Sequence, residues 1–310
     1  MGRANGVLGP IESEDLGFTL MHEHILICNW SMRQSFEDWI DIPEAIQNAT
    51  EEVSQAQALG VGTLVDMTPI NLGRDVHVMR EVAERAEAQI VAATGLYYHH
   101  EPWMGGWEVD RLVEWLLRDI EKGIQGTDSK AGIIKAATAE AGVTPDNLQT
   151  LQVAARLQRA SGIPISTHTT PHNESGLLQQ DVFEAEGVDL GRVVIGHCGD
   201  SDDLDYLEKI LNRGSYIGMD RFGLDMILST ERRVSTVARL CERGWAHRMV
   251  LSHDACCSID FYPKGTPMPP QWNYRHICTD VVPALRAEGV SEADLTEMTV
   301  MNPRRVLCNE

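Results

Sequence analysis

Short β-rich runs alternate with helix-favouring segments along the whole chain. The runs are rich in Val, Ile and Thr, and the segments between them have the spacing of amphipathic helices. The runs are FTLMHEHILI, VGTLVDMT, QIVAATGLY, AGIIKAAT, IPISTHT, RVVIGHC, SYIGMDRF and RMVLSHD, which begin at residues 18, 61, 89, 131, 163, 192, 215 and 248. Strand–helix alternation indicates a parallel sheet, and eight units predict an α/β fold of the closed (β/α)8 TIM-barrel type.

A polar residue that could take part in catalysis or metal binding stands toward the carboxyl end of each run. These residues are His22 and His24, Asp66, Tyr97, Lys135, His168, His197, Asp220 with Arg221, and Asp254. In a barrel the carboxyl ends of all strands face one pocket. In an open sheet the outer strands would lie too far apart to share a site. The pattern therefore favours the barrel and predicts one site at its mouth.

Composition is typical of one large domain spanning residues 1–310. The chain is 43% hydrophobic, yet it contains no apolar stretch long enough to cross a membrane. Its start, MGRANGVLGP, lacks the apolar core of a secretory signal. Seven cysteines, an odd number with two of them adjacent at 256 and 257, favour reduced thiols. We therefore expect a cytoplasmic protein.

Charge and missing motifs exclude several classes of function. The formal net charge of −20 argues against nucleic acid or an anionic membrane as a partner. The chain also lacks a GxSxG nucleophile elbow, an HExxH zinc helix and a GxxxxGK[ST] phosphate loop. The remaining candidates are chemistry at the strand ends or non-catalytic binding of a small molecule.

His22 and His24 occupy alternate positions of the first predicted strand. Side chains two apart on a strand share a face, and two neutral imidazoles on one face suit a divalent metal ion. The alternative interpretation is a pair of histidines satisfied within the core. His168, His197 and Asp254 at neighbouring strand ends are hard to explain by packing alone, which favours a metal site.

Lys135 is flanked by Gly132-Ile133-Ile134 and Ala136-Ala137, so we expect it to be buried within a strand. An unpaired buried ammonium is costly and tends to lose its charge. Two interpretations remain. Lys135 either forms a salt bridge with Asp254 or another acid, or it is modified to an anion that bridges two metal ions.

The phrases GFTLMHEHIL, GIIKAAT, STHTT, VVIGHCGD, GMDRFG and SHDACCSID resemble the phosphotriesterase family of the amidohydrolase superfamily, and most closely its phosphotriesterase-like lactonases. The likeness runs in order from IESEDLGFTL to NPRRVL. It implies that Lys135 is carboxylated to a carbamate that bridges two divalent ions, with zinc first and cobalt, manganese or iron as alternatives. It also implies that His22, His24 and Asp254 complete the ligands of one ion, and that His168 and His197 complete those of the other.

The carbamate, Asp254 and a bridging hydroxide would balance most of the charge of two divalent cations. An unmodified lysine would add to that charge. In the function implied by the resemblance, the ions share a hydroxide that attacks the substrate, and Asp254 takes the proton.

The resemblance further implies a small, hydrophobic, neutral substrate. Tyr97, and Arg221 in a GxDR pattern, match the lactonases, which act on acyl-homoserine or other hydrophobic lactones in quorum quenching and have promiscuous phosphotriesterase activity. The alternative functions are an organophosphate phosphotriesterase (aryldialkylphosphatase) or a carboxylesterase on the same site. The alternative structural interpretations are a packing tyrosine and an Arg221 paired with Asp220 or Asp225.

Two further features concern the substrate pocket and the assembly. Phe261 stands where these lactonases tend to have tryptophan, so we expect it to line the pocket. The stretch Tyr97-Tyr98-His99-His100-Glu101 is more polar than its counterpart in lactonases, which leaves the preferred lactone or ester open. A homodimer is suggested by the resemblance alone.

Overall fold

The computed structural model describes residues 2–309, and its central sheet contains all eight predicted strands. They are β3 (Phe18–Ile27), β4 (Val61–Asp66), β5 (Gln89–Gly95), β6 (Ile133–Ala137), β7 (Ile165–His168), β8 (Val193–Ile195), β9 (Tyr216–Met219) and β10 (Met249–Leu251). Each strand pairs in parallel with the next along the chain. The strand predictions are therefore confirmed.

The sheet closes through the segment that follows β10. A further strand, β11 (Cys256–Ile259), pairs in parallel with β3 on the side away from β4. Just before it, the amide of Asp254 donates to the carbonyl oxygen of His22 at 2.9 Å, and the amide of His24 donates to the carbonyl oxygen of Ala255 at 2.8 Å. The last and first strands thus meet, and the predicted TIM barrel is confirmed.

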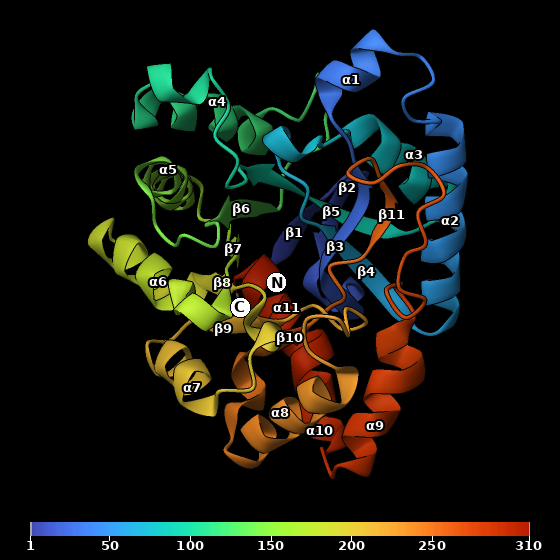
Figure 1. Cartoon of the computed structure of the whole chain (residues 1–310), viewed down its shortest axis with the longest axis vertical. Helices are drawn as coiled ribbons and strands as arrows, with labels where there is room; N and C mark the ends of the chain where they lie inside the picture. The colour runs from blue at the N-terminus through green and yellow to red at the C-terminus, as the bar shows by residue number, and fades with distance from the viewer. Residues whose placement is uncertain (1, 310) are drawn as a thin grey trace.

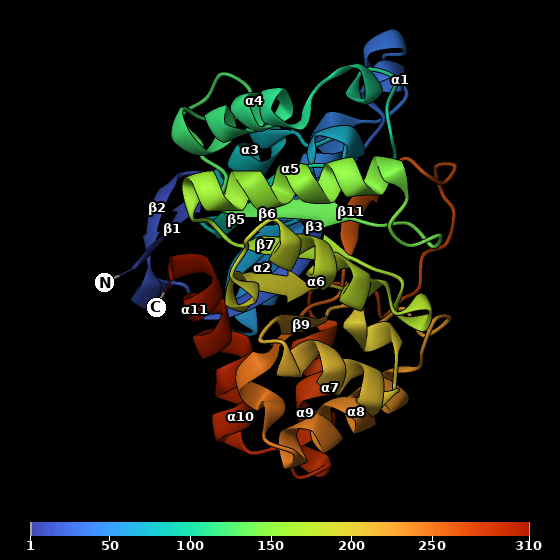
Figure 2. The ribbon, with the colours of Figure 1, turned by 90° about the vertical axis from the view of Figure 1, so that its left-hand side faces the viewer.

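Helices surround this barrel (Figure 1). They are α1 (Trp30–Ser35), α2 (Ile42–Ala58), α3 (Val76–Ala86), α4 (Val109–Glu121), α5 (Pro145–Ser161), α6 (Ser175–Ala185), α7 (Leu204–Asn212), α8 (Thr230–Glu242), α9 (Val282–Ala287), α10 (Glu292–Thr296) and α11 (Asn302–Cys308). A hairpin of β1 (Arg3–Gly6) and β2 (Gly9–Glu12) lies at the end of the barrel where both termini are found, whereas β11 lies toward the opposite end (Figure 2). Within residues 2–309, no helix has the length and apolar character needed to cross a membrane.

The outward faces of the strands pack against apolar helix faces in one large cluster, and a second buried cluster fills the inside of the barrel. Met21, Val65, Ile133 and Val250 belong to the inner cluster. Because side chains two apart on a strand share a face, Lys135 points to the same side as Ile133. The apolar layer therefore forms a floor, and the polar residues at the strand ends lie above it.

Candidate metal centre

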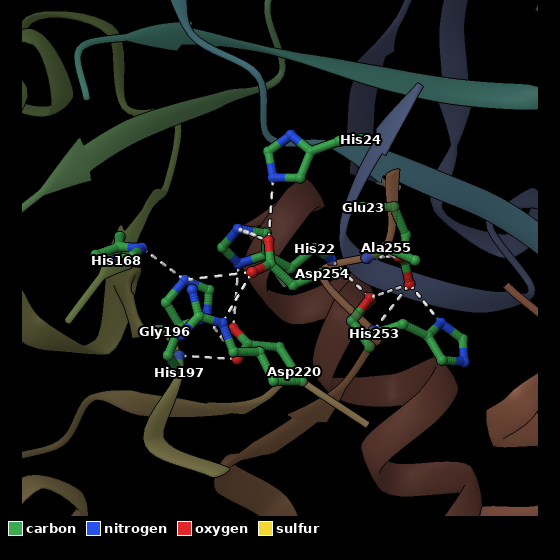
Figure 3. A network of polar contacts seen from close by, with 12 residues as sticks. His22, Glu23, His24, His168, Gly196, His197, Asp220, His253, Asp254 and Ala255 are labelled. Carbon is green, nitrogen blue, oxygen red and sulfur yellow. Dashed lines mark hydrogen bonds and ion pairs between the residues drawn. The ribbon is translucent and has the colours of Figure 1, made fainter. Parts of the chain in front are cut away.

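Three of the expected side chains meet directly, two from the middle of β3 and one from the segment just after β10. One donor atom from each of His22, His24 and Asp254 lies within 4.8 Å of the others, an arrangement that could hold a metal ion. Asp254 Oδ1 is 3.1 Å from His24 Nε2 and 3.4 Å from His22 Nε2. Figure 3 shows the Asp254 carboxylate between the two imidazoles. Residues 230 positions apart in the chain thus form one donor set.

Lys135 is only 1% exposed, and its Nζ lies 2.8 Å from His22 Nε2. Among residues 2–309 no carboxylate forms an ion pair with it, so the structure does not support the salt bridge considered above. Burial lowers the pKa of this lysine to about 8. A buried amine that forms no ion pair within the described residues is therefore present among the candidate ligands, and the nearby carboxylates of Asp254 and Asp220 only partly offset the effect of burial on its pKa.

His168 and His197 form the other half of the cluster. His168 Nδ1 is 2.9 Å from His197 Nε2, which in turn lies 3.8 Å from Asp254 Oδ2. Burial, helped by neighbouring positive charge, lowers the pKa of His22 to about 3 and that of His168 well below its usual value. Both rings are therefore neutral at physiological pH, which is the form that binds metal.

Arg221 has different partners from those considered in the sequence. Its Nε donates to Asp254 Oδ2 at 2.9 Å, and its Nη1 donates to Asp200 Oδ2 at 2.9 Å, so the alternative interpretation, in which Arg221 pairs with Asp220 or Asp225, is wrong. Burial alone would raise the pKa of the Asp254 carboxyl. His197, Arg221 and His22 outweigh that effect and hold the pKa well below its usual value. Asp254 is therefore ionised.

Tyr97 forms a wall beside His168. Its hydroxyl lies 3.5 Å from His168 Nδ1, and the two rings meet edge to face with centroids 5.3 Å apart. Burial raises the pKa of the phenol well above its usual value, so the hydroxyl stays protonated. Tyr97 thus places a neutral hydrogen-bond donor at the edge of the cluster.

Two asparagines that the sequence did not mark hold the loop after β5. Asn71 Oδ1 accepts from the amide of Tyr97 at 2.7 Å, and Asn71 Nδ2 donates to the carbonyl oxygen of His99 at 2.8 Å. Asn147 Nδ2 donates to the carbonyl oxygen of Tyr98 at 3.1 Å. The polar loop that departs from the lactonase pattern is thus fixed from both sides.

Glu23, between the two histidines of β3, organises the barrel closure. Its carboxylate accepts from Ser252 Oγ at 2.8 Å, His253 Nδ1 at 2.6 Å and the amide of Ala255 at 2.9 Å. These contacts lie on both sides of Asp254 in the chain. Strand alternation places Glu23 on the face opposite His22 and His24, where a buried carboxylate requires its own donors. Strand alternation in the sequence was therefore enough to predict that Glu23 needs hydrogen-bond donors of its own. It was not enough to identify those donors.

We expect Glu23→Gln to destabilise the fold, because an amide group would turn a donor toward the N–H groups of this segment. The free energy of unfolding should fall by about 1–3 kcal/mol, the cost of an unsatisfied buried polar group. Urea denaturation measures this, with Glu231→Gln on the exposed side of α8 as the control. Equal unfolding midpoints for the two variants would contradict the assigned role of Glu23.

Phe261 lies apart from the cluster. It is 54% exposed and lines a groove of about 1320 Å³ formed by residues between 37 and 48 and between 256 and 268. That lining does not include Tyr97 or Arg221. Contact between Phe261 and a substrate therefore stays a prediction.

The pattern of the phosphotriesterase family matches residues 2–307. The chain belongs to the phosphotriesterase family. It is 47% identical to the "phosphotriesterase homology protein" of Mycobacterium tuberculosis, over 99% of this chain and 98% of that protein. It is 38% identical to the "aryldialkylphosphatase" of Saccharolobus solfataricus, over 95% of this chain and 96% of the relative.

A solved structure described as the phosphotriesterase from Mycobacterium tuberculosis superposes with a TM-score of 0.94 at 45% identity, covering 98% of both chains. The resemblance stated from the sequence is confirmed, and the protein is a phosphotriesterase-family hydrolase. This family is binuclear and metal-dependent, and the histidine and aspartate groups of this chain could bind metal. The neutral imidazoles and ionised Asp254 suit divalent cations.

Proposed function

We propose that this phosphotriesterase-family hydrolase is a lactonase with side activity on organophosphate triesters. The observation that carries the proposal is the pair of donors beside the metal-binding groups. The protonated Tyr97 hydroxyl lies next to His168, and the Arg221 guanidinium is held against Asp254. Two donors of this kind can stabilise the oxygen atoms of a small neutral lactone as charge develops on them.

We propose further that His22, His24 and Asp254 hold one divalent ion and that His168 and His197 hold a second, with Lys135 shared between them. Bound ions would polarise the substrate carbonyl or phosphoryl oxygen and supply hydroxide at neutral pH. Zinc suits these nitrogen and oxygen donors best, and cobalt, manganese and iron also accept them.

The burial of Lys135 supports its carboxylation. Only a neutral amine adds CO2, and an amine with a pKa of about 8 is substantially neutral near that pH. The Nζ lone pair forms the N–C bond while one C–O π bond of CO2 opens onto oxygen, an N–H proton is released, and the product is a carbamate anion. Carboxylation would replace the positive charge of an ammonium beside His22 Nε2 with a negative charge, and a negative charge suits a cation-binding site.

Asp254 and Arg221 have separate roles in proton handling. Asp254 is ionised and would accept the proton released when water adds to the substrate. Burial would lower the pKa of Arg221, but Asp254 and Asp200 raise it above its usual value, so the guanidinium stays charged. Arg221 therefore orients the Asp254 carboxylate and contributes positive charge rather than carrying the proton itself.

The second candidate is an organophosphate triesterase, which is favoured by the 38% identity to a relative named aryldialkylphosphatase. A carboxylesterase would use the same groups. Comparison of kcat/KM for a panel of lactones, an aryl dialkyl phosphate and an aryl ester tests the proposal. A preference for the aryl dialkyl phosphate over every lactone would overturn it.

Tyr97→Trp should lower lactone turnover more than phosphotriester turnover. The change removes the phenol donor but keeps an aromatic wall, and loss of one such donor costs about 100-fold in kcat. Steady-state kinetics on both substrates measure this, with Tyr262→Trp as the control because Tyr262 is 51% exposed and lines the separate groove. Equal losses on the two substrates would show that Tyr97 only packs.

A further inference from the structure

Asp220 directly follows β9, is only 1% exposed, and contacts two imidazoles from different parts of the barrel. Its Oδ2 lies 3.1 Å from His22 Nδ1, and its Oδ1 lies 3.0 Å from His197 Nδ1. Oδ1 also accepts from the backbone amide of His197 at 2.8 Å. Figure 3 shows this carboxylate below the two rings, on the side away from His24.

These contacts determine which nitrogen of each ring carries hydrogen. An ionised carboxylate only accepts hydrogen bonds, so Nδ1 of both His22 and His197 must be the protonated nitrogen. The lone pair of each ring is then on Nε2. His22 Nε2 faces Lys135 Nζ at 2.8 Å, and His197 Nε2 faces His168 Nδ1 at 2.9 Å. One carboxylate therefore directs a donor atom from each half of the cluster toward the centre.

The surrounding backbone is shaped to admit this carboxylate. A Cβ atom on Gly218 would collide with the Asp220 carboxylate, and one on Gly196 would collide with the carbonyl oxygen of Thr167 and approach Asp220 Oδ2 to 3.2 Å. His197 has a φ of 60°, which is unusual for a residue with a side chain, and its amide is the one that donates to Asp220. Close approach and the left-handed backbone thus combine to place Asp220 between the two rings.

We propose that Asp220 is a positioning residue that couples the two metal sites, so that its loss lowers the binding affinity for both ions together. The proposal rests on the assignment of His22 to one ion and His197 to the other. His24 provides a contrast, because its Nδ1 is bound by a separate partner, Thr68 Oγ1, at 2.8 Å. Loss of the Thr68 hydroxyl should affect one ion only.

Asp220→Ala removes both carboxylate oxygens, so neither Nδ1–H keeps its acceptor. Loss of an outer partner of this kind costs about 10–100-fold in metal affinity. Isothermal titration of the full chain with Zn²⁺, after removal of metal by a chelator, should show both binding steps weakened by this factor in Asp220→Ala. In Thr68→Val only one step should weaken. Circular dichroism checks that each variant keeps its fold.

Two readouts separate this proposal from the proposed function. Fewer than two ions bound to the unmutated chain would overturn the two-metal assignment and the coupling with it. Two ions in the unmutated chain, with one step or neither weakened in Asp220→Ala, would overturn the coupling alone.

Nitrogen NMR of the metal-free, unmutated chain needs no variant. It should show Nδ1–H on both His22 and His197, and Nε2–H on either ring would overturn the proposal.

Discussion

Lys135→Ala should release metal and lower kcat on the order of a thousand-fold or more, while the barrel stays folded. Nζ of Lys135 lies 2.8 Å from His22 Nε2 and the residue is only 1% exposed, so its side chain lies buried among the candidate ligands. If the lysine is a carbamate, its loss removes the anion that offsets repulsion between two cations. Metal content and kcat on a lactone measure the effect, and Lys130→Ala, an exposed lysine just before β6, is the control.

Chemical rescue distinguishes the carbamate from an unmodified amine. The alanine variant leaves space beside His22 for a small carboxylate, so acetate or propionate with excess metal should restore part of the activity. Intact-protein mass measurement of the unmutated chain should show a labile addition of CO2. Retention of metal by Lys135→Ala, with no response to small acids, would contradict the carbamate.

The barrel and much of the candidate site could be predicted because both depend on short-range patterns. Strand propensity and helix periodicity identify the alternating units. Because the strands of such a barrel are parallel, their carboxyl ends all lie at the same end of the barrel. His22, Lys135 and Asp254 could therefore be grouped before any contact was known. The family resemblance then supplied the grouping of ligands into two sets, which spacing alone left open.

Contacts between distant segments could not be predicted in the same way. The Glu23 carboxylate bonds to a segment about 230 residues away, and no local pattern names those donors. Pairing with nearby acids was the alternative interpretation of Arg221 from the sequence, but in the folded barrel Arg221 contacts Asp254, 33 residues along the chain, and Asp200 instead. The shared contact of Asp220 with two imidazoles likewise appears only once the closed barrel brings the His22 side chain of β3 across to the ends of β8 and β9.

His22→Ala and His168→Ala test the two-metal assignment, because each variant removes a proposed ligand of a different ion. The purified, unmutated protein should carry about two divalent ions per chain. Each variant should hold one or none, because a lost imidazole leaves too few donors for tetrahedral coordination. Activity should fall in parallel with metal content, and both are measurable on the same sample by elemental analysis and kinetics.

His172→Ala is the matched control, since the His172 side chain is 71% exposed and lies outside the donor cluster. It should keep both ions and full kcat. His22 and His168 differ from it because burial lowers the pKa of both rings and keeps them neutral, and because the outer nitrogen of His22, Nδ1, contacts Asp220 at 3.1 Å. A single ion per chain in the unmutated protein, together with full activity, would contradict the binuclear assignment and leave His168 and His197 without a metal to bind.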